Sequence, residues 1–91
     1  MRGYDVKNMG AIAQRYARIQ SGLSPYSTLF LRVGDFYEVF GSKAAQAASV
    51  LGISVTLRDG CAMCGIPWRQ KETAEPKLIR AGISPFFTDG E

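Results

Sequence analysis

An alternating segment that ends in Asp59-Gly60 constrains the fold of this chain more than any other feature. Apolar and polar residues alternate over Ile53–Arg58, the period of a half-buried β-strand. Its apolar positions are Ile53, Val55 and Leu57. Asp-Gly favours a two-residue type I′ turn, because both central residues of that turn need positive φ. The chain then returns over Cys61–Ile66, so we predict an antiparallel hairpin with one buried face.

Three segments are predicted to be helices. Their expected bounds are about Val6 to Gln20, about Lys43 to Leu51, and Thr73 to Gly82. Apolar residues at helical spacing give the first a buried stripe of Met9, Ile12, Ala13, Tyr16 and Ile19. The expected N-caps are Asp5 or Asn8, then Ser42, then Thr73. Glycines at positions 22, 52 and 82 are expected at the helix ends.

The remaining apolar segments are predicted to be strands. Thr28–Val33 has apolar residues on both faces, which is typical of a strand covered partly on both sides. Phe36–Phe40 is compatible with a strand or with a strand-end loop. Pro85 confines the last strand, Ile83–Thr88, to a sheet edge or a bulge. The order α-β-α-β-β-α-β predicts an α/β (α+β) fold, a small mixed sheet flanked by about three helices.

Composition limits the function classes that need to be considered. The 91 residues, of 9.9 kDa, suffice for a single domain over residues 1–91. A net charge of +3 permits nucleic-acid contact without demanding it. No apolar run approaches the ~20 residues of a membrane span, and no secretory signal precedes the first helix. We therefore expect a cytoplasmic domain with no membrane partner.

The chain offers little to a metal or a redox cofactor. It has no His and two Cys, and Cys61-Ala-Met-Cys64 has the spacing of zinc ribbons and of redox motifs. Zinc needs four ligands, and the two cysteines of one strand would point to opposite faces. We interpret them as small apolar residues, reduced and metal-free, and we expect no cofactor.

Gly34-Asp-Phe-Tyr-Glu38 allows two interpretations. In one, Phe36 and Phe40 belong to the core and Tyr37 is a surface ring. In the other, Phe36 is an exposed wedge that enters between base steps of duplex DNA. Glu38, two residues later, would then form a hydrogen bond to the displaced base. The pattern alone does not choose between them.

A resemblance to a known family separates these interpretations. The segment Leu29-Phe-Leu-Arg-Val-Gly-Asp-Phe-Tyr-Glu-Val-Phe40 closely resembles the N-terminal mismatch-recognition domain of the MutS family. One further matching segment precedes Leu29–Phe40, and the others follow it in the same order as in that family. They are Gln14–Ile19, Ala44–Leu51, Ile53–Arg58, Met63–Trp68 and Lys77–Gly82. The resemblance extends from about Met9 to Phe87.

The resemblance implies a non-enzymatic DNA-binding module with no catalytic residues. Phe36 matches the family's stacking wedge, and Glu38 matches the acid that contacts the mispaired base. Arg58 matches a position that contacts the DNA backbone, and Arg32 a supporting position near the same surface. The implied partner is double-stranded DNA with a mismatch or distortion. ATP is not expected, because no Gly-x-x-x-x-Gly-Lys-Ser/Thr motif is present.

The chain also departs from the family pattern. Family members are many times longer, and the segment between Arg58 and Met63 is shorter here. Arg69 and Gln70 stand where the family usually has His and Ala. The chain is either an excised domain or a stand-alone protein, and the start at Met1 favours the second.

A stand-alone copy allows a rival function. A phage or mobile element could use such a module as an inhibitor that binds a host protein, for example an immune nuclease. Exposed aromatic and basic residues suit protein interfaces as well as DNA. An enzyme is not expected, because Asp35 and Glu38 alone are a thin basis for a metal-dependent nuclease.

Overall fold

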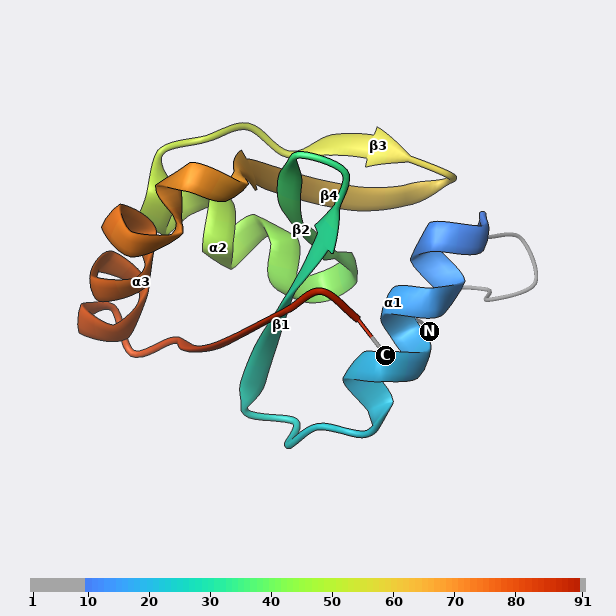
Figure 1. Ribbon diagram of the computed structural model, residues 1–91, viewed down its shortest axis with the longest axis horizontal. Coiled ribbons are helices and arrows are strands. Elements are labelled where there is room, and N and C mark those ends of the chain that lie inside the picture. The colour runs from blue at the N-terminus through green and yellow to red at the C-terminus, as the bar shows by residue number, and fades with distance from the viewer. Residues whose placement is uncertain (1–9, 91) are drawn as a thin grey trace.

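Five strands form one mixed sheet in the residues that the computed structural model describes, 10–90 (Figure 1). They are β1 (Ser27–Val33), β2 (Phe36–Phe40), β3 (Thr56–Arg58), β4 (Cys61–Pro67) and β5 (Ser84–Thr88). The order across the sheet is β3-β4-β2-β1-β5. Only the β1–β5 pair is parallel among these neighbours. Phe36–Phe40 is thus a strand, and Pro85 lies on an edge strand, as expected.

Helices cover both faces of this sheet. They are α1 (Ala11–Ser21), α2 (Ala44–Leu51) and α3 (Lys71–Arg80). In Figure 1, α1 and α3 lie on opposite sides of β1 and β2. On one face, the α1 residue Tyr16 packs against Phe40 and donates a 2.6 Å hydrogen bond to the Leu29 carbonyl. On the other face, α2 contacts β4, and α3 packs on β5 and on α2. The predicted fold class is confirmed.

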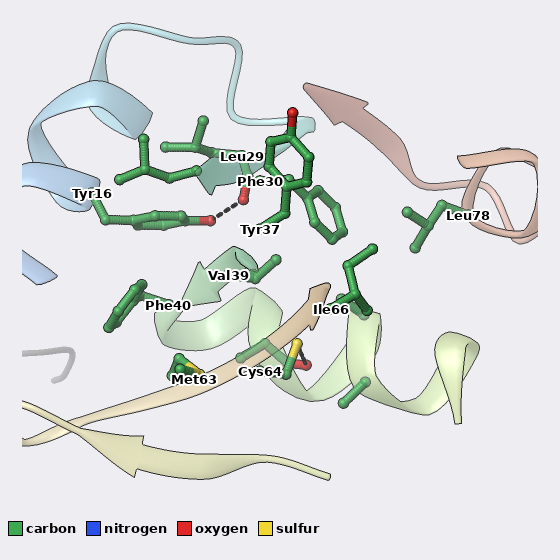
Figure 2. Packing of buried hydrophobic residues seen from close by; sticks show 14 of the residues in the cluster. Tyr16, Leu29, Phe30, Tyr37, Val39, Phe40, Met63, Cys64, Ile66 and Leu78 are labelled. Carbon is green, nitrogen blue, oxygen red and sulfur yellow. Dashed lines mark hydrogen bonds between the residues drawn. The ribbon is translucent and has the colours of Figure 1, made fainter. Parts of the chain in front are cut away.

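The core lies on both sides of β1. Leu29, Phe30 and Leu31 are all buried, as expected for a strand covered on both faces. Figure 2 shows Leu29 and Phe30 among the packed side chains. Phe30 stacks on Phe87 of β5 at a ring-centroid distance of 4.7 Å. Phe40 is also buried, in agreement with its expected place in the core. None of the described helices is long and apolar enough to cross a membrane.

The helix starts differ from those predicted. The expected start at Val6, its caps Asp5 and Asn8, and Met9 lie outside the described residues. Ser42 does not cap α2; it lies in a 3₁₀ turn, Gly41–Lys43, which leads directly into the helix. Thr73 does not cap α3, because the 3₁₀ turn Trp68–Gln70 starts that helix at Lys71. Gly52 ends α2 with φ +69°, as predicted.

The β3–β4 hairpin forms, but its buried face does not. Asp59 and Gly60 have φ of +53° and +73°, as a type I′ turn requires. However, β3 begins only at Thr56, and Leu57 is 79% exposed. The expectation of a half-buried strand over Ile53–Arg58 is therefore wrong. The physical reason is that β3 is a short edge strand, whereas α2 packs on its neighbour β4.

Candidate nucleic-acid interface

Phe36 projects beside the tip of the β1–β2 hairpin. The turn contains only Gly34 and Asp35, so Val33 pairs with Phe36, and Gly34 adopts φ +59°, which favours glycine. Phe36 is 45% exposed and Tyr37 only 8%. The interpretation with a core Phe36 and a surface Tyr37 is therefore wrong for both rings. The two-residue turn places Tyr37 on the face that α2 and α3 cover.

Glu38 is a buried acid on the same face as Phe36. Its side chain is 2% exposed, and its backbone pairs with Gly65 of β4. A Cβ added at Gly65 would lie 3.3 Å from the Glu38 Cγ and from the Tyr37 carbonyl oxygen. A side chain at this position would therefore require Glu38 or the β2 backbone to shift by a few tenths of an ångström. A glycine inside a strand is the sequence signal for such a site, although it does not identify the side chain that fills the space.

Arg58 reaches across β4 to this acid. Its Nη1 lies 3.1 Å from one carboxylate oxygen of Glu38 and donates a 3.3 Å hydrogen bond to the other. The two side chains differ in exposure, 40% for Arg58 and 2% for Glu38. The type I′ turn at Asp59-Gly60 turns the chain directly after Arg58. The outer part of Arg58 therefore remains accessible to a second anion while it holds Glu38.

Burial controls the protonation of Glu38. Loss of hydration raises the pKa of its carboxyl, the guanidinium of Arg58 lowers that pKa, and the negative charge of Asp59 raises it. The raised pKa makes the neutral form more accessible than in an exposed glutamate. Ionised Glu38 accepts hydrogen bonds only, whereas neutral Glu38 also donates one. Both forms suit the polar edge of a nucleobase.

The three residues share one hollow in the surface. A cavity of about 200 Å³ is lined by residues of β2, β3 and β4 and of the segment before β3. The lining residues are Phe36, Glu38, Ser54, Thr56, Arg58, Met63, Cys64 and Gly65. Phe36 and Glu38 of β2 are thus brought together with Arg58 of β3. Sequence reasoning missed Ser54, Thr56 and Met63, for which the pattern gives no signal.

Arg32 does not join this group. It pairs with Tyr37 in the β1–β2 ladder and therefore points to the opposite face from Phe36. Its Nε donates a 2.5 Å hydrogen bond to the Gly34 carbonyl, and its guanidinium carbon lies 4.9 Å from the Trp68 ring centroid. The structure thus separates Arg32 from the other three predicted residues.

The cysteines lie on opposite faces of β4. Cys61 lines a cavity with Tyr16 of α1, whereas the Cys64 thiol donates a 3.4 Å hydrogen bond to the Ala44 carbonyl of α2. Both are buried, and burial raises the pKa of Cys64 to about 11 and also raises that of Cys61. In residues 10–90 no group of three or more His, Cys, Asp or Glu side chains is arranged to hold a metal ion.

Comparison with known proteins identifies the family. The family model of MutS domain I matches residues 11–85. The chain belongs to the MutS domain I family. The matched segment contains β1, β2, β3 and β4, and therefore Phe36, Glu38 and Arg58 with their whole cavity.

Several proteins named DNA mismatch repair protein MutS are similar to this domain I chain. That of Flavobacterium psychrophilum is 42% identical over 70 residues, 71% of this chain and 8% of its own length. That of Thermodesulfovibrio yellowstonii is 37% identical over 76 residues, covering 78% and 9%. That of Treponema pallidum strain Nichols is 41% identical over 58 residues, covering 64% and 6%. The chain thus spans less than a tenth of these relatives.

Proposed function

We propose that this chain is a DNA-binding module that recognises mismatched or easily distorted duplex DNA. The observation that carries the proposal is a half-exposed Phe36 next to a buried Glu38 on one face of a hairpin tip. Membership of the MutS domain I family, and relatives named as mismatch repair proteins, support the same reading. The proposal concerns one module, and it includes no catalytic step, no ATP and no membrane.

Phe36 is the wedge in this proposal. An apolar ring that enters between base steps unstacks them at a cost of a few kcal/mol, which is lowest where pairing is already weak. Stacking of a base on an aromatic ring contributes about 1–3 kcal/mol. Since about 1.4 kcal/mol corresponds to a tenfold change in affinity, the wedge suffices for roughly tenfold to hundredfold discrimination.

Glu38 and Arg58 complete the contact. Glu38 lies two residues beyond the wedge on the same face, so its carboxyl meets the edge of the base that Phe36 displaces. Arg58 and Arg32 contact backbone phosphates. Arg58 is suited to this role because 40% of its side chain remains exposed while it holds Glu38.

The test is to replace Phe36 with alanine in the full chain and titrate mismatched and matched oligonucleotide duplexes. We expect the preference for the mismatch to disappear, with little loss of affinity for matched duplex. Phe86→Ala is a matched control, because Phe86 is also 45% exposed but lies on the edge strand β5. Both variants should lose a similar, small amount of thermal stability. Equal discrimination by Phe36→Ala and wild type would overturn the proposal.

A protein-binding inhibitor is the second candidate. The observation that favours it is the exposed apolar pair Leu57 and Val55, at 79% and 42%, in the edge strand β3 and directly before it. Such residues suit a partner protein, for example a host immune nuclease, more than they suit phosphates. A wild-type chain that binds neither duplex, together with a nuclease complex that Leu57→Asp abolishes, would establish this candidate in place of the first.

A further inference from the structure

Two arginines stack on Trp68, the only tryptophan, and a lysine lies over the nearby Phe87 ring, on the face opposite the wedge. We call Arg32, Trp68, Arg69 and Lys71 the cationic cluster. The guanidinium carbons of Arg32 and Arg69 lie 4.9 Å and 5.4 Å from the Trp68 ring centroid. The Lys71 Nζ lies 5.2 Å from the centroid of the Phe87 ring. Members of the cluster line one cavity of about 400 Å³.

The cations of the cluster are available to an anion. Within residues 10–90, none of the three has a carboxylate within 4.0 Å, in contrast to Arg58, which is paired with Glu38. Glu72 and Asp89 also line the cavity but lie beyond that distance. Stacking holds a guanidinium by its flat face and leaves the N–H groups at its edge able to donate. The Arg32 Nε already donates to the Gly34 carbonyl, so Arg32 offers its two terminal nitrogens only. The cluster therefore presents fixed donors that match the oxygens of phosphate groups.

The cluster is joined to the wedge through the backbone. The Trp68 amide donates a 2.8 Å hydrogen bond to the Asp35 carbonyl in the β1–β2 turn. Pro67, the residue before Trp68, pairs with Phe36. Arg32 and Phe36 point to opposite faces of the same hairpin. The hairpin tip thus carries an aromatic ring on one face and the cationic cluster on the other.

This arrangement matches the shape of a DNA groove. An element that enters the minor groove has one phosphate strand on each side, and a wedge that unstacks a base step kinks the duplex and opens the groove beyond its usual width of about 6 Å. With Phe36 inserted, Arg58 would face the strand on the wedge side. We propose that the cationic cluster binds the phosphates of the other strand, with Arg69 and Lys71 as its main contacts. This inference takes duplex DNA as the partner from the proposed function, and it adds a second, sequence-independent site.

Matched duplex tests the cluster separately from mismatch recognition. Affinity for a fully paired duplex is measured over a range of salt concentrations for Arg69→Ala and Lys71→Ala. Each neutralised phosphate contributes about 0.9 to the slope of log K against log salt. We expect each variant to lower the slope by about 0.9 and to weaken binding. Arg80 is an exposed cation at the other end of α3 from Lys71, so Arg80→Ala is the charge-matched control and should leave the slope unchanged.

Trp68 supplies a second readout, because it is the single tryptophan of the chain and lies within the cluster. Duplex should change Trp68 emission in wild type and in Phe36→Ala, and much less in Arg69→Ala. If Phe36→Ala loses only its preference for mismatched duplex, the proposed phosphate contact of the cluster still stands. If Phe36→Ala retains that preference, only the proposed wedge is refuted. If the slope of log K against log salt is unchanged in both Arg69→Ala and Lys71→Ala, the proposal that the cluster binds phosphates is overturned. The proposal would also be overturned if inorganic phosphate or polyglutamate saturated the same change in Trp68 emission while the protein did not bind duplex.

Discussion

Replacing Arg58 with alanine leaves Glu38 buried without its counter-ion. Hydrogen bonds to charged groups contribute about 1.5–3 kcal/mol each, but Arg58 is 40% exposed and solvent screening reduces that figure. We therefore expect Arg58→Ala to lower the free energy of unfolding at pH 7 by about 1–2 kcal/mol. For a domain of this size the melting temperature should fall by about 4–8 °C per kcal/mol.

The pH dependence identifies the cause. Burial raises the pKa of Glu38 above the value of about 4.3 in the unfolded chain, so the folded state binds the proton more tightly. Ionised Glu38 thus costs stability at pH values above its folded pKa, and the cost disappears below about 4.3. Arg58 lowers this pKa, so its removal raises the pKa further and increases the cost of ionised Glu38. The difference between wild type and Arg58→Ala should therefore shrink as the pH falls from 7 towards 4.

The assay is thermal unfolding of four proteins at several pH values. Besides wild type and Arg58→Ala, they are Glu38→Gln and the double variant, which together form a double-mutant cycle. Glu38→Gln retains the size of the side chain without its charge, so Arg58→Ala should cost little in that background. Equal destabilisation at pH 7 and pH 4, or equal destabilisation with and without the Glu38 charge, would refute the reasoning.

Three further predictions concern the surroundings of the site. Gly65→Ala should displace Glu38, lowering stability and abolishing mismatch preference in the same duplex titration; retention of both would contradict the close approach. Tyr16→Phe leaves the Leu29 carbonyl without its 2.6 Å hydrogen bond and should cost about 1–2 kcal/mol in chemical unfolding, whereas an unchanged midpoint would argue against that bond. Native mass spectrometry should find the two cysteines reduced and metal-free, and stoichiometric zinc would contradict this.

Sequence reasoning located most of the elements but not what covers them. Alternation over Ile53–Arg58 predicted a strand of which only Thr56–Arg58 forms, whereas Asp59-Gly60 correctly predicted the turn. Alternation predicts that one face of a strand is apolar, but it does not predict whether a helix covers that face. Leu57 is exposed because β3 is an edge strand of three residues. The position of a strand in the sheet depends on pairing between segments that are distant in the sequence, so the local pattern could not predict it.

The candidate site was predicted in its residues but only partly in its geometry. The residue pattern offered Phe36 and Glu38 as one of two interpretations. The family resemblance favoured that one and added Arg58, and the three residues share one cavity. Arg32 entered in the same way but faces the other side. The two-residue turn decides this: since Val33 pairs with Phe36, its neighbour Arg32 must point away from the wedge. Both faces of this hairpin are rich in apolar residues, so hydrophobicity alone could not set that register.

The burial of Glu38 is a poor choice for stability alone. A buried acid with a single partner loses hydration that the ion pair does not fully restore, and apolar replacement of such pairs is often neutral or stabilising. Here the Glu38 side chain packs tightly over a glycine, Gly65, and its charge is paired with Arg58, which remains 40% exposed. Groups that are costly to the fold and perturbed in pKa concentrate at functional sites. If Glu38 contacts a base, the same burial that weakens the fold removes water from the carboxyl in advance, so the contact forms without that cost at the moment of binding.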